Sequence, residues 1–338
     1  MWYKNVDLFN VAEMKYDAEN MAFSLLRVPE SCEKNMQEQG RNMNRCSIGV
    51  EFRFEIKDEV TFILKSKNPE GTNCYLYYGD VQGPWDQSAF IVGKDNKKIF
   101  VKKYKSTEKQ VDVINKLKDQ RYPSSLYRLV FDGTEVQLVD IIWSSKTDKK
   151  PSESRGRILF YGSSITSGSI SFLPMESFTY LLGKHLKMDV INKGFPGSCR
   201  MEKEVADYLS CLKDYQIGII ELGINVIGEW GKERFKDAVS YFLKRIVFFN
   251  PDKRFYVTDI FSYFNECCSA VTDEKVSDFR NVVSNECSLL KNNNVTYISG
   301  DRLLSDRKNI CADLVHPDID GHKEIYMNLA DIIGKEHV

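Results

Sequence analysis

The segment RILFYGSSIT, residues 157–166, contains the feature that decides the fold. An apolar run at 157–161 is followed by a Gly-Ser-Ser turn at 162–164, after which a helical pattern begins. This order predicts a strand, a tight turn that carries a serine, and a helix. Such a turn places a hydroxyl at the carboxyl end of a sheet strand, where open α/β sheets bind their ligands. One turn of this kind is weak evidence, because most Gly-Ser-Ser turns after strands are only turns.

The second half of the chain repeats the alternation of strand and helix. Apolar runs are separated by helix-like stretches, of which residues 233–249 are the clearest, and this predicts a parallel sheet with right-handed crossovers. We expect the strands near residues 157–161, 188–192, 216–222, 254–260 and 295–298.

Three further motifs accompany the Gly-Ser-Ser turn. NKGFPG (192–197) follows the second expected strand, ELGIN (221–225) closes the third, and DLVHP (313–317) precedes the C-terminal helix. Because each motif lies where a strand or loop ends, one crevice can collect all of them. Serine, glycine, asparagine and histidine in this order resemble the four sequence blocks of the SGNH (GDSL-type) hydrolases. The resemblance covers roughly residues 155–335 and implies a three-layer parallel-sheet hydrolase domain.

The chemistry explains why these residue types are needed. A serine hydroxyl is a poor nucleophile until a base removes its proton, so Ser164 needs a histidine within hydrogen-bond reach. His316 is the best placed, because Asp313 precedes it by three residues and can hold one ring nitrogen while the other faces Ser164. Pro317 disfavours helical geometry at His316, which predicts an extended loop for the pair.

The resemblance also implies donors for a tetrahedral intermediate. They are the backbone N–H of Ser164, the backbone N–H of Gly197 and the side-chain amide of Asn225, and one such donor is typically worth about 3–4 kcal/mol of barrier. Gly194 stays an alternative to Gly197, and Asn225 has the alternative role of a helix cap.

The sequence departs from the family pattern at one position. The family carries Gly-Asp-Ser, whereas Ser163 stands here before the expected nucleophile, so the adjacent carboxylate is absent. The other histidines have simpler roles, since His322 is expected to cap or pack the last helix and His185 to end a helix. Glu221 is expected to make a structural hydrogen bond.

The composition limits the classes of partner. The 338 residues suggest roughly two domains, and a formal net charge of −1 gives no field that would recruit nucleic acid or anionic lipid. No run approaches the ~20 apolar residues that span a membrane, and no apolar signal core opens the chain. The nine cysteines show no Cys-x-x-Cys spacing, so we expect reduced thiols in the cytoplasm and neither a metal nor a cofactor. The oligomeric state is open.

Residues 1–145 have a different pattern. Period-two segments with turn residues between them predict an antiparallel, jelly-roll-like β-sandwich domain. Asp132-Gly133 predicts a hairpin turn. The polar stretch 146–156 predicts a linker, and the hydrolase domain then covers 157–338. The expected strands lie near residues 47–56, 59–65, 74–78, 98–101, 127–131 and 136–142.

A sandwich ahead of such a hydrolase resembles the family-two carbohydrate esterases. The candidate substrate-binding residues are Trp230 and Glu229, which follow the Asn225 loop, and Trp85, which either stacks on a sugar or covers the end of the sandwich. We expect a serine esterase that removes a short acyl group, acetyl above all, from a carbohydrate or similar polar ester. The alternatives are a lysophospholipase or thioesterase for longer chains and a degenerate carbohydrate-binding protein.

Overall fold

The structure is a computed structural model that describes residues 1–103, 108–117, 120–145, 156–267, 271–290 and 294–335. It contains two compact units, of which the first comprises Met1–Glu30 with Asn44–Arg155 and the second Ser31–Met43 with Gly156–Val338. Except for Gly156, the expected linker at 146–156 lies outside the described residues, so that boundary stays a prediction. Residues 31–43 group with the hydrolase unit although they lie in the range expected for the sandwich domain.

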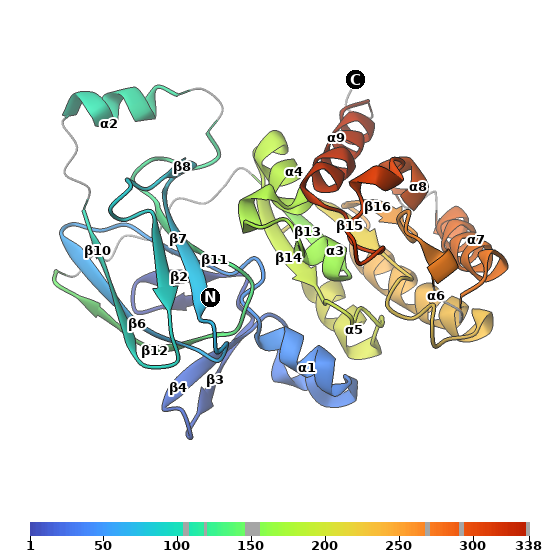
Figure 1. Cartoon of the computed structure of the whole chain (residues 1–338), viewed down its shortest axis with the longest axis horizontal. Helices are drawn as coiled ribbons and strands as arrows, with labels where there is room; N and C mark the ends of the chain where they lie inside the picture. The colour runs from blue at the N-terminus through green and yellow to red at the C-terminus, as the bar shows by residue number, and fades with distance from the viewer. Residues whose placement is uncertain (104–107, 118–119, 146–155, 268–270, 291–293, 336–338) are drawn as a thin grey trace. The chain divides into compact units, whose positions relative to one another are not determined.

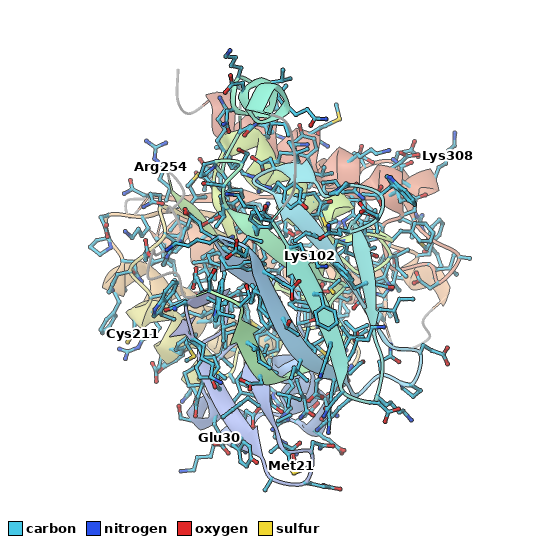
Figure 2. The ribbon with its side chains drawn as sticks, turned by 90° about the vertical axis from the view of Figure 1, so that its left-hand side faces the viewer. Met21, Glu30, Lys102, Cys211, Arg254 and Lys308 are labelled. Carbon is cyan, nitrogen blue, oxygen red and sulfur yellow. The ribbon has the colours of Figure 1, made fainter. Side chains whose placement is uncertain are left out.

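The first unit is a sandwich of two antiparallel sheets. Phe52 of one sheet packs on Phe62 of the other, with ring centroids 5.6 Å apart, and the apolar core lies between the sheets. Figure 2 shows these strands with their side chains, with Lys102 at the end of an edge strand. One sheet has the order β1 (Trp2–Tyr3), β2 (Val6–Phe9), β5 (Glu51–Phe54), β11 (Tyr127–Phe131), β7 (Thr72–Tyr78), β8 (Val81–Gln82), with β9 (Ala89–Val92) also on β7. The other has the order β10 (Lys97–Lys102), β6 (Glu59–Ser66), β12 (Val136–Trp143), β4 (Ala22–Leu26), β3 (Glu13–Asp17).

The expected hairpin at Asp132-Gly133 is wrong. A turn does lie there, with Gly133 at φ +100° and the Asp132 carboxylate accepting a hydrogen bond from the Thr134 backbone N–H. However, β11 pairs with β5 and β7, whereas β12 pairs with β4 and β6. The turn therefore carries the chain from one sheet to the other instead of joining paired neighbours.

The second unit is built on a five-stranded parallel sheet, as expected. Its order is β14 (Asp189–Gly194), β13 (Arg157–Gly162), β15 (Ile217–Glu221), β16 (Arg254–Thr258), β17 (Val295–Ile298), and all pairs are parallel. Since β14 and β15 flank β13 on opposite sides, the chain reverses its winding direction at β13. The carboxyl end of β13 is thus the topological switch point at which open α/β sheets bind ligands.

Helices cover both faces of this sheet, which gives the expected three layers (Figure 1). Alternate residues of β13 show why, because Phe160 packs on Phe178 of α4 while Tyr161 packs 4.4 Å from Phe242 of α6. The helices of this unit are η1 (Glu30–Asn35) and α1 (Glu38–Arg45) at its N-terminal segment, then α3 (Ser164–Ser167), η2 (Pro174–Glu176), α4 (Phe178–Leu186), α5 (Lys203–Cys211), α6 (Lys232–Phe249), η3 (Asn265–Cys267), α7 (Asp273–Leu290), α8 (Gly300–Leu303), η5 (Arg307–Asn309) and α9 (Ile319–Lys335). The first unit carries α2 (Glu108–Asn115).

Candidate active site

Ser164 lies at the sharp turn between β13 and α3. Ser163 is the N-cap of α3, and its hydroxyl accepts a hydrogen bond from the Ile165 backbone N–H at 3.1 Å. Gly162 is required before them, because a Cβ at this position would collide with Thr166 and Glu221. The turn therefore presents the Ser164 side chain at the carboxyl end of the central strand.

Ser164, His316 and Asp313 form one hydrogen-bonded chain. Ser164 Oγ lies 2.7 Å from His316 Nε2, and His316 Nδ1 lies 2.8 Å from Asp313 Oδ2. Because the carboxylate can only accept, Nδ1 carries the ring proton and Nε2 is left to accept the serine proton. This is the arrangement in which a histidine acts as a base toward a serine.

Backbone contacts fix Asp313 in this position. Its Oδ1 accepts hydrogen bonds from the backbone N–H groups of Val315 and His316, both at 2.9 Å. Burial tends to raise the pKa of Asp313, but these bonds and that of the His316 ring outweigh it and lower the pKa. The carboxylate therefore stays ionised next to the histidine.

Three donors remain open around the serine. Neither the backbone N–H of Ser164 nor that of Gly197 has a hydrogen-bond partner among the described residues. The Asn225 side chain is oriented by its Oδ1, which accepts from the Cys199 backbone N–H at 3.0 Å, and this leaves Nδ2 available. The N–H of Gly194, in contrast, donates to Asn192 Oδ1 at 2.8 Å. The geometry thus favours Gly197 over Gly194 as a donor.

Glu221 holds the serine turn from the neighbouring strand. Its Oε2 accepts hydrogen bonds from the Ser163 backbone N–H at 2.7 Å, and from the hydroxyls of Ser163 and Thr166 at 2.8 Å each. The side chain is buried, which raises the pKa of Glu221. The carboxyl group that the sequence lacks beside Ser164 is thus supplied by β15.

The other two described histidines lie outside this chain of hydrogen bonds. His322 is fully buried at the start of α9, where its Nδ1 accepts from the Phe178 backbone N–H and its Nε2 donates to the Ser169 carbonyl. Burial lowers the pKa of His322 to about 4, so the ring is neutral. His185 lies in the last turn of α4, and its Nδ1 is 3.2 Å from the Tyr326 hydroxyl.

The expected substrate-binding residues have different surroundings. Glu229 forms a two-pronged ion pair with Arg200, with O–N distances of 3.1 and 2.5 Å. Trp230 is only 6% exposed and lies beneath the guanidinium groups of Arg200 and Arg234, so its ring is no open platform for a sugar. Trp85, in the first unit, is 93% exposed, which argues against the alternative that it covers the end of the sandwich. Its binding role stays a prediction.

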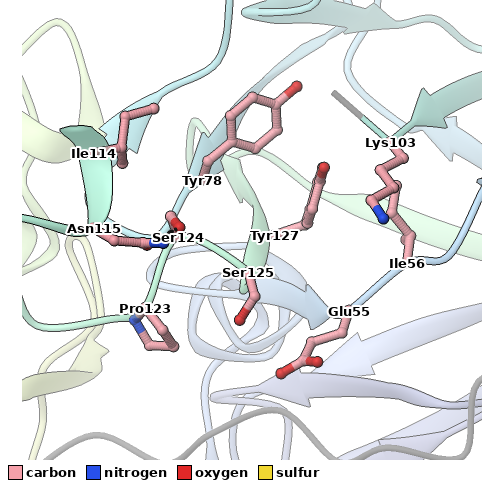
Figure 3. A pocket seen from close by; sticks show the side chains of 10 residues that line it. All are labelled: Glu55, Ile56, Tyr78, Lys103, Ile114, Asn115, Pro123, Ser124, Ser125 and Tyr127. Atoms are coloured by element: carbon pink, nitrogen blue, oxygen red, sulfur yellow. Dashed lines mark hydrogen bonds between the residues drawn. The ribbon is translucent and has the colours of Figure 1, made fainter. Parts of the chain in front are cut away.

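A separate cavity lies within the first unit (Figure 3). It has a volume of about 430 Å³, and Tyr78 and Tyr127 line it together with Glu55 and Lys103. None of the residues expected to carry the chemistry lines this cavity, and we assign it no part in the reaction.

Sequence reasoning missed two contacts of the site. Gln39 of α1 packs against Gly197, so closely that a Cβ on this glycine would collide with it, and its amide donates to the Pro196 carbonyl at 3.3 Å. Arg200 was not a candidate although it pairs with Glu229. Neither residue belongs to a motif. Folding brings Gln39 to Gly197, and it brings Arg200, which follows Gly197 by three residues, to Glu229.

The fold and the four motifs together define an SGNH hydrolase. The chain belongs to the GDSL-like lipase/acylhydrolase family, whose pattern matches residues 155–333, more than half of the sequence. The protein is accordingly an esterase or acyl hydrolase. No curated protein is similar enough in sequence to count as a match.

Solved structures share the fold of the whole chain. A salicylyl-acyltransferase from a tetracycline biosynthetic pathway matches 99% of this chain and 95% of its own, at 14% identity and a TM-score of 0.79. A family-two carbohydrate esterase from Cellvibrio japonicus matches 98% and 95%, at 12% identity and a TM-score of 0.63. An acetyl xylan esterase from the rumen bacterium Butyrivibrio proteoclasticus matches 99% and 97%, at 10% identity and a TM-score of 0.57. At these identities the likeness is one of fold.

Among the described residues, no helix combines the length and the apolar character that crossing a bilayer demands.

Proposed function

We propose that this protein is a serine esterase that removes a short acyl group, acetyl above all, from a carbohydrate or a similar polar ester. The observation that carries the proposal is the continuous chain of hydrogen bonds from Ser164 through His316 to Asp313, with distances of 2.7 and 2.8 Å. Ser164 is the nucleophile of the proposal, and His316 is its base.

Acylation follows from this geometry. Ser164 Oγ attacks the carbonyl carbon of the ester while its proton passes to His316 Nε2, and Asp313 stabilises the imidazolium. The negative oxygen of the tetrahedral intermediate accepts hydrogen bonds from the N–H groups of Ser164 and Gly197 and from Asn225 Nδ2. The intermediate then collapses, the bond to the alcohol oxygen breaks, and His316 returns the proton to the leaving alcohol.

Deacylation uses the same groups in the second half of the cycle. A water molecule gives a proton to His316 Nε2 and attacks the acyl carbon, and the three donors again bind the negative oxygen. The acid leaves when the bond to Ser164 Oγ breaks, and the proton on His316 restores the serine hydroxyl.

The polarity of one cavity in the hydrolase unit supports a polar substrate. A cavity in the same unit is lined mainly by charged and polar side chains, among them Arg234, Lys203 and Asp237. Two of the structures with the same fold are, by name, a carbohydrate esterase and an acetyl xylan esterase, and this supports acetyl as the acyl group.

A second candidate is an esterase for longer acyl chains. The loop that follows α3 exposes 82% of Phe172 and 45% of Ile170, and both residues have positive φ angles. Solvent-exposed apolar side chains so close in sequence to Ser164 favour contact with a long acyl chain of a substrate.

Hydrolysis of p-nitrophenyl acetate and p-nitrophenyl octanoate tests both candidates. We expect the wild type to prefer acetate and Ser164→Ala to lose at least about 10³-fold in kcat. Ser288→Ala is the control, because this hydroxyl lies on the exposed side of α7 and bonds only within the helix. Full activity of Ser164→Ala would refute the serine mechanism, and a preference for octanoate would establish the second candidate. If neither ester reacts, acetylated oligosaccharides distinguish a selective deacetylase from the carbohydrate-binding alternative.

A further inference from the structure

A cavity of about 700 Å³ lies in the hydrolase unit, and no step of the proposed reaction uses it. Its walls come from the segment around η1 and α1, from the loop before α5, and from the first half of α6. The charged and aromatic residues that matter for its chemistry are Arg200, Glu202, Lys203, Trp230, Arg234 and Asp237.

The cavity shares its loops with the candidate oxyanion donors. Arg200 directly follows Cys199, whose backbone N–H holds the Asn225 amide in place. Trp230 comes five residues after Asn225, and both lie on the loop between β15 and α6. A ligand group in the cavity would therefore contact the same two loops that surround the ester carbonyl in the proposed reaction.

One cation of the cavity is already neutralised. Arg200 is 8% exposed, and both of its terminal nitrogens bind the carboxylate of Glu229. Its guanidinium also lies 5.3 Å from the centre of the Trp230 ring. Arg200 therefore lines the cavity as a buried, paired side chain and offers little charge to a ligand.

Two other cations are held in place without being neutralised. The Arg234 guanidinium lies 4.3 Å from the centre of the Trp230 ring, and Lys203 Nζ lies 5.2 Å from that of Tyr241. Neither forms an ion pair with a carboxylate within the described part of the chain. An aromatic face orients a cation but carries no net negative charge, and the carboxylate that acts on Arg234 from nearby, Glu229, is already bound by Arg200.

The acidic side chains of the cavity offset this charge only in part. Burial raises the pKa of Glu202 to about 7, so near neutral pH a large fraction of this group carries no charge. Asp237 is exposed on α6 and is the other carboxylate of the wall. The balance of charge near neutral pH is therefore positive.

We propose that this cavity binds an anionic group, a carboxylate, sulfate or phosphate, carried by the alcohol part of the ester substrate, with Arg234 and Lys203 as its ligands. The assignment to the alcohol part rests on the proposed function, because an acetyl group has no charge of its own. The larger part of the substrate must then carry the anion.

Binding of inorganic sulfate, measured by calorimetry, tests the cavity without any turnover. We expect the wild type to bind sulfate and the double variant Lys203→Gln/Arg234→Gln to bind it about fivefold more weakly or worse. Lys232→Gln is the matched control, since this lysine is on the same helix but pairs with Asp278 at 2.7 Å and does not line the cavity. No binding by the wild type, equal binding by the double variant, or an equal loss in the control would overturn the proposal.

A pair of esters of equal size tests the substrate. We expect the wild type to hydrolyse 4-acetoxybenzoate with a higher kcat/KM than the neutral 4-acetoxybenzamide, and the double variant to lose this preference. Equal kcat/KM values in the wild type would overturn the assignment to the substrate. If neither ester reacts while sulfate binds as expected, the failure lies in the proposed esterase function and not in the cavity.

Discussion

Removing the carboxylate of Glu221 is expected to damage both stability and turnover. This side chain accepts three hydrogen bonds from the turn that carries Ser164, two from Ser163 and one from Thr166. Glu221→Ala leaves these three donors without a partner in a buried site. Glu221→Gln has nearly the same shape and retains one oxygen that can accept them.

The size of the loss in stability follows from the number of hydrogen-bond donors left without an acceptor. A buried donor left unsatisfied costs about 1–3 kcal/mol, and three donors in one network do not add fully. We therefore expect Glu221→Ala to lower the free energy of unfolding by about 3–6 kcal/mol and Glu221→Gln by about 1–2 kcal/mol. A shift of the Ser164 hydroxyl by about 1 Å would cost roughly 10² in kcat, with little change in KM.

The pH dependence of stability distinguishes the effect of the Glu221 charge from the effect of its shape. Burial raises the pKa of Glu221 above its unfolded value of about 4.5, so the folded state holds this proton more tightly than the unfolded state. The contribution of the protonated Glu221 side chain to the free energy of unfolding is fully present below pH 4.5 and is lost as the pH rises through the folded-state pKa. Because glutamine cannot lose a proton, the stability advantage of the wild type over Glu221→Gln should shrink as the pH rises.

Chemical denaturation between pH 4 and 8 measures this difference, and ester hydrolysis by the same samples gives kcat. Glu286→Gln is the control, since Glu286 is similarly buried, 4% exposed on α7, and lies outside the site. An advantage that grows with pH would refute the raised pKa. Unchanged kcat in Glu221→Ala would refute the role of this residue in positioning Ser164.

Two further predictions concern other contacts of the site. Asn225→Ala removes the Nδ2 donor and should lower kcat by about 10²–10³ while KM stays nearly constant; a rise in KM alone would instead indicate a role in substrate binding. His322 is buried with its pKa lowered from 6.5 to about 4, so the unfolded state binds the proton more readily and stability should fall as the pH drops from 6.5 toward 4, by about 3 kcal/mol in all. Denaturation of His322→Gln should show no such slope, and a persistent slope would assign it to other groups.

The parallel sheet could be predicted closely from the sequence because its signal is local. Strands buried on both faces are continuous apolar runs, and the expected runs at 157–161 and 295–298 agree with β13 and β17 within one residue. The hydrogen bonds between Ser164, His316 and Asp313 agree with the contacts expected from the motifs, because Ser164 directly follows a predictable strand and Asp313 and His316 lie three residues apart on one loop.

The sandwich architecture of the first unit could be predicted, but the bounds and the pairing of its strands could not. The expected strand at 47–56 contracts to Glu51–Phe54, and β2 to β4 before residue 27 were not expected. The turn at Asp132-Gly133 has the local chemistry of a hairpin, yet pairing depends on which sheet buries each strand. That choice is made by contacts far apart in the sequence, such as those between the two Phe-rich faces.

The expected structural hydrogen bond of Glu221 is confirmed, but its partners could not be predicted, and neither could the contacts of Gln39 and Arg200, for a related reason. Glu221 lies 58 residues from Ser163, and Gln39 lies 157 residues from Pro196. No periodicity or motif links positions at such separations, and only the packed strands and helices bring them together.

The membership of residues 31–43 in the hydrolase unit has a consequence for how the chain is made. These residues leave the ribosome more than a hundred residues before β13. Gln39 is therefore made long before its partners Pro196 and Gly197, and most of the sandwich strands are made in between. The hydrolase unit is therefore discontinuous in sequence, and cutting the chain at residue 145 would yield a fragment that lacks Gln39, the side chain that packs against Gly197. Fusion, permutation or domain exchange with this protein would have to carry both pieces together.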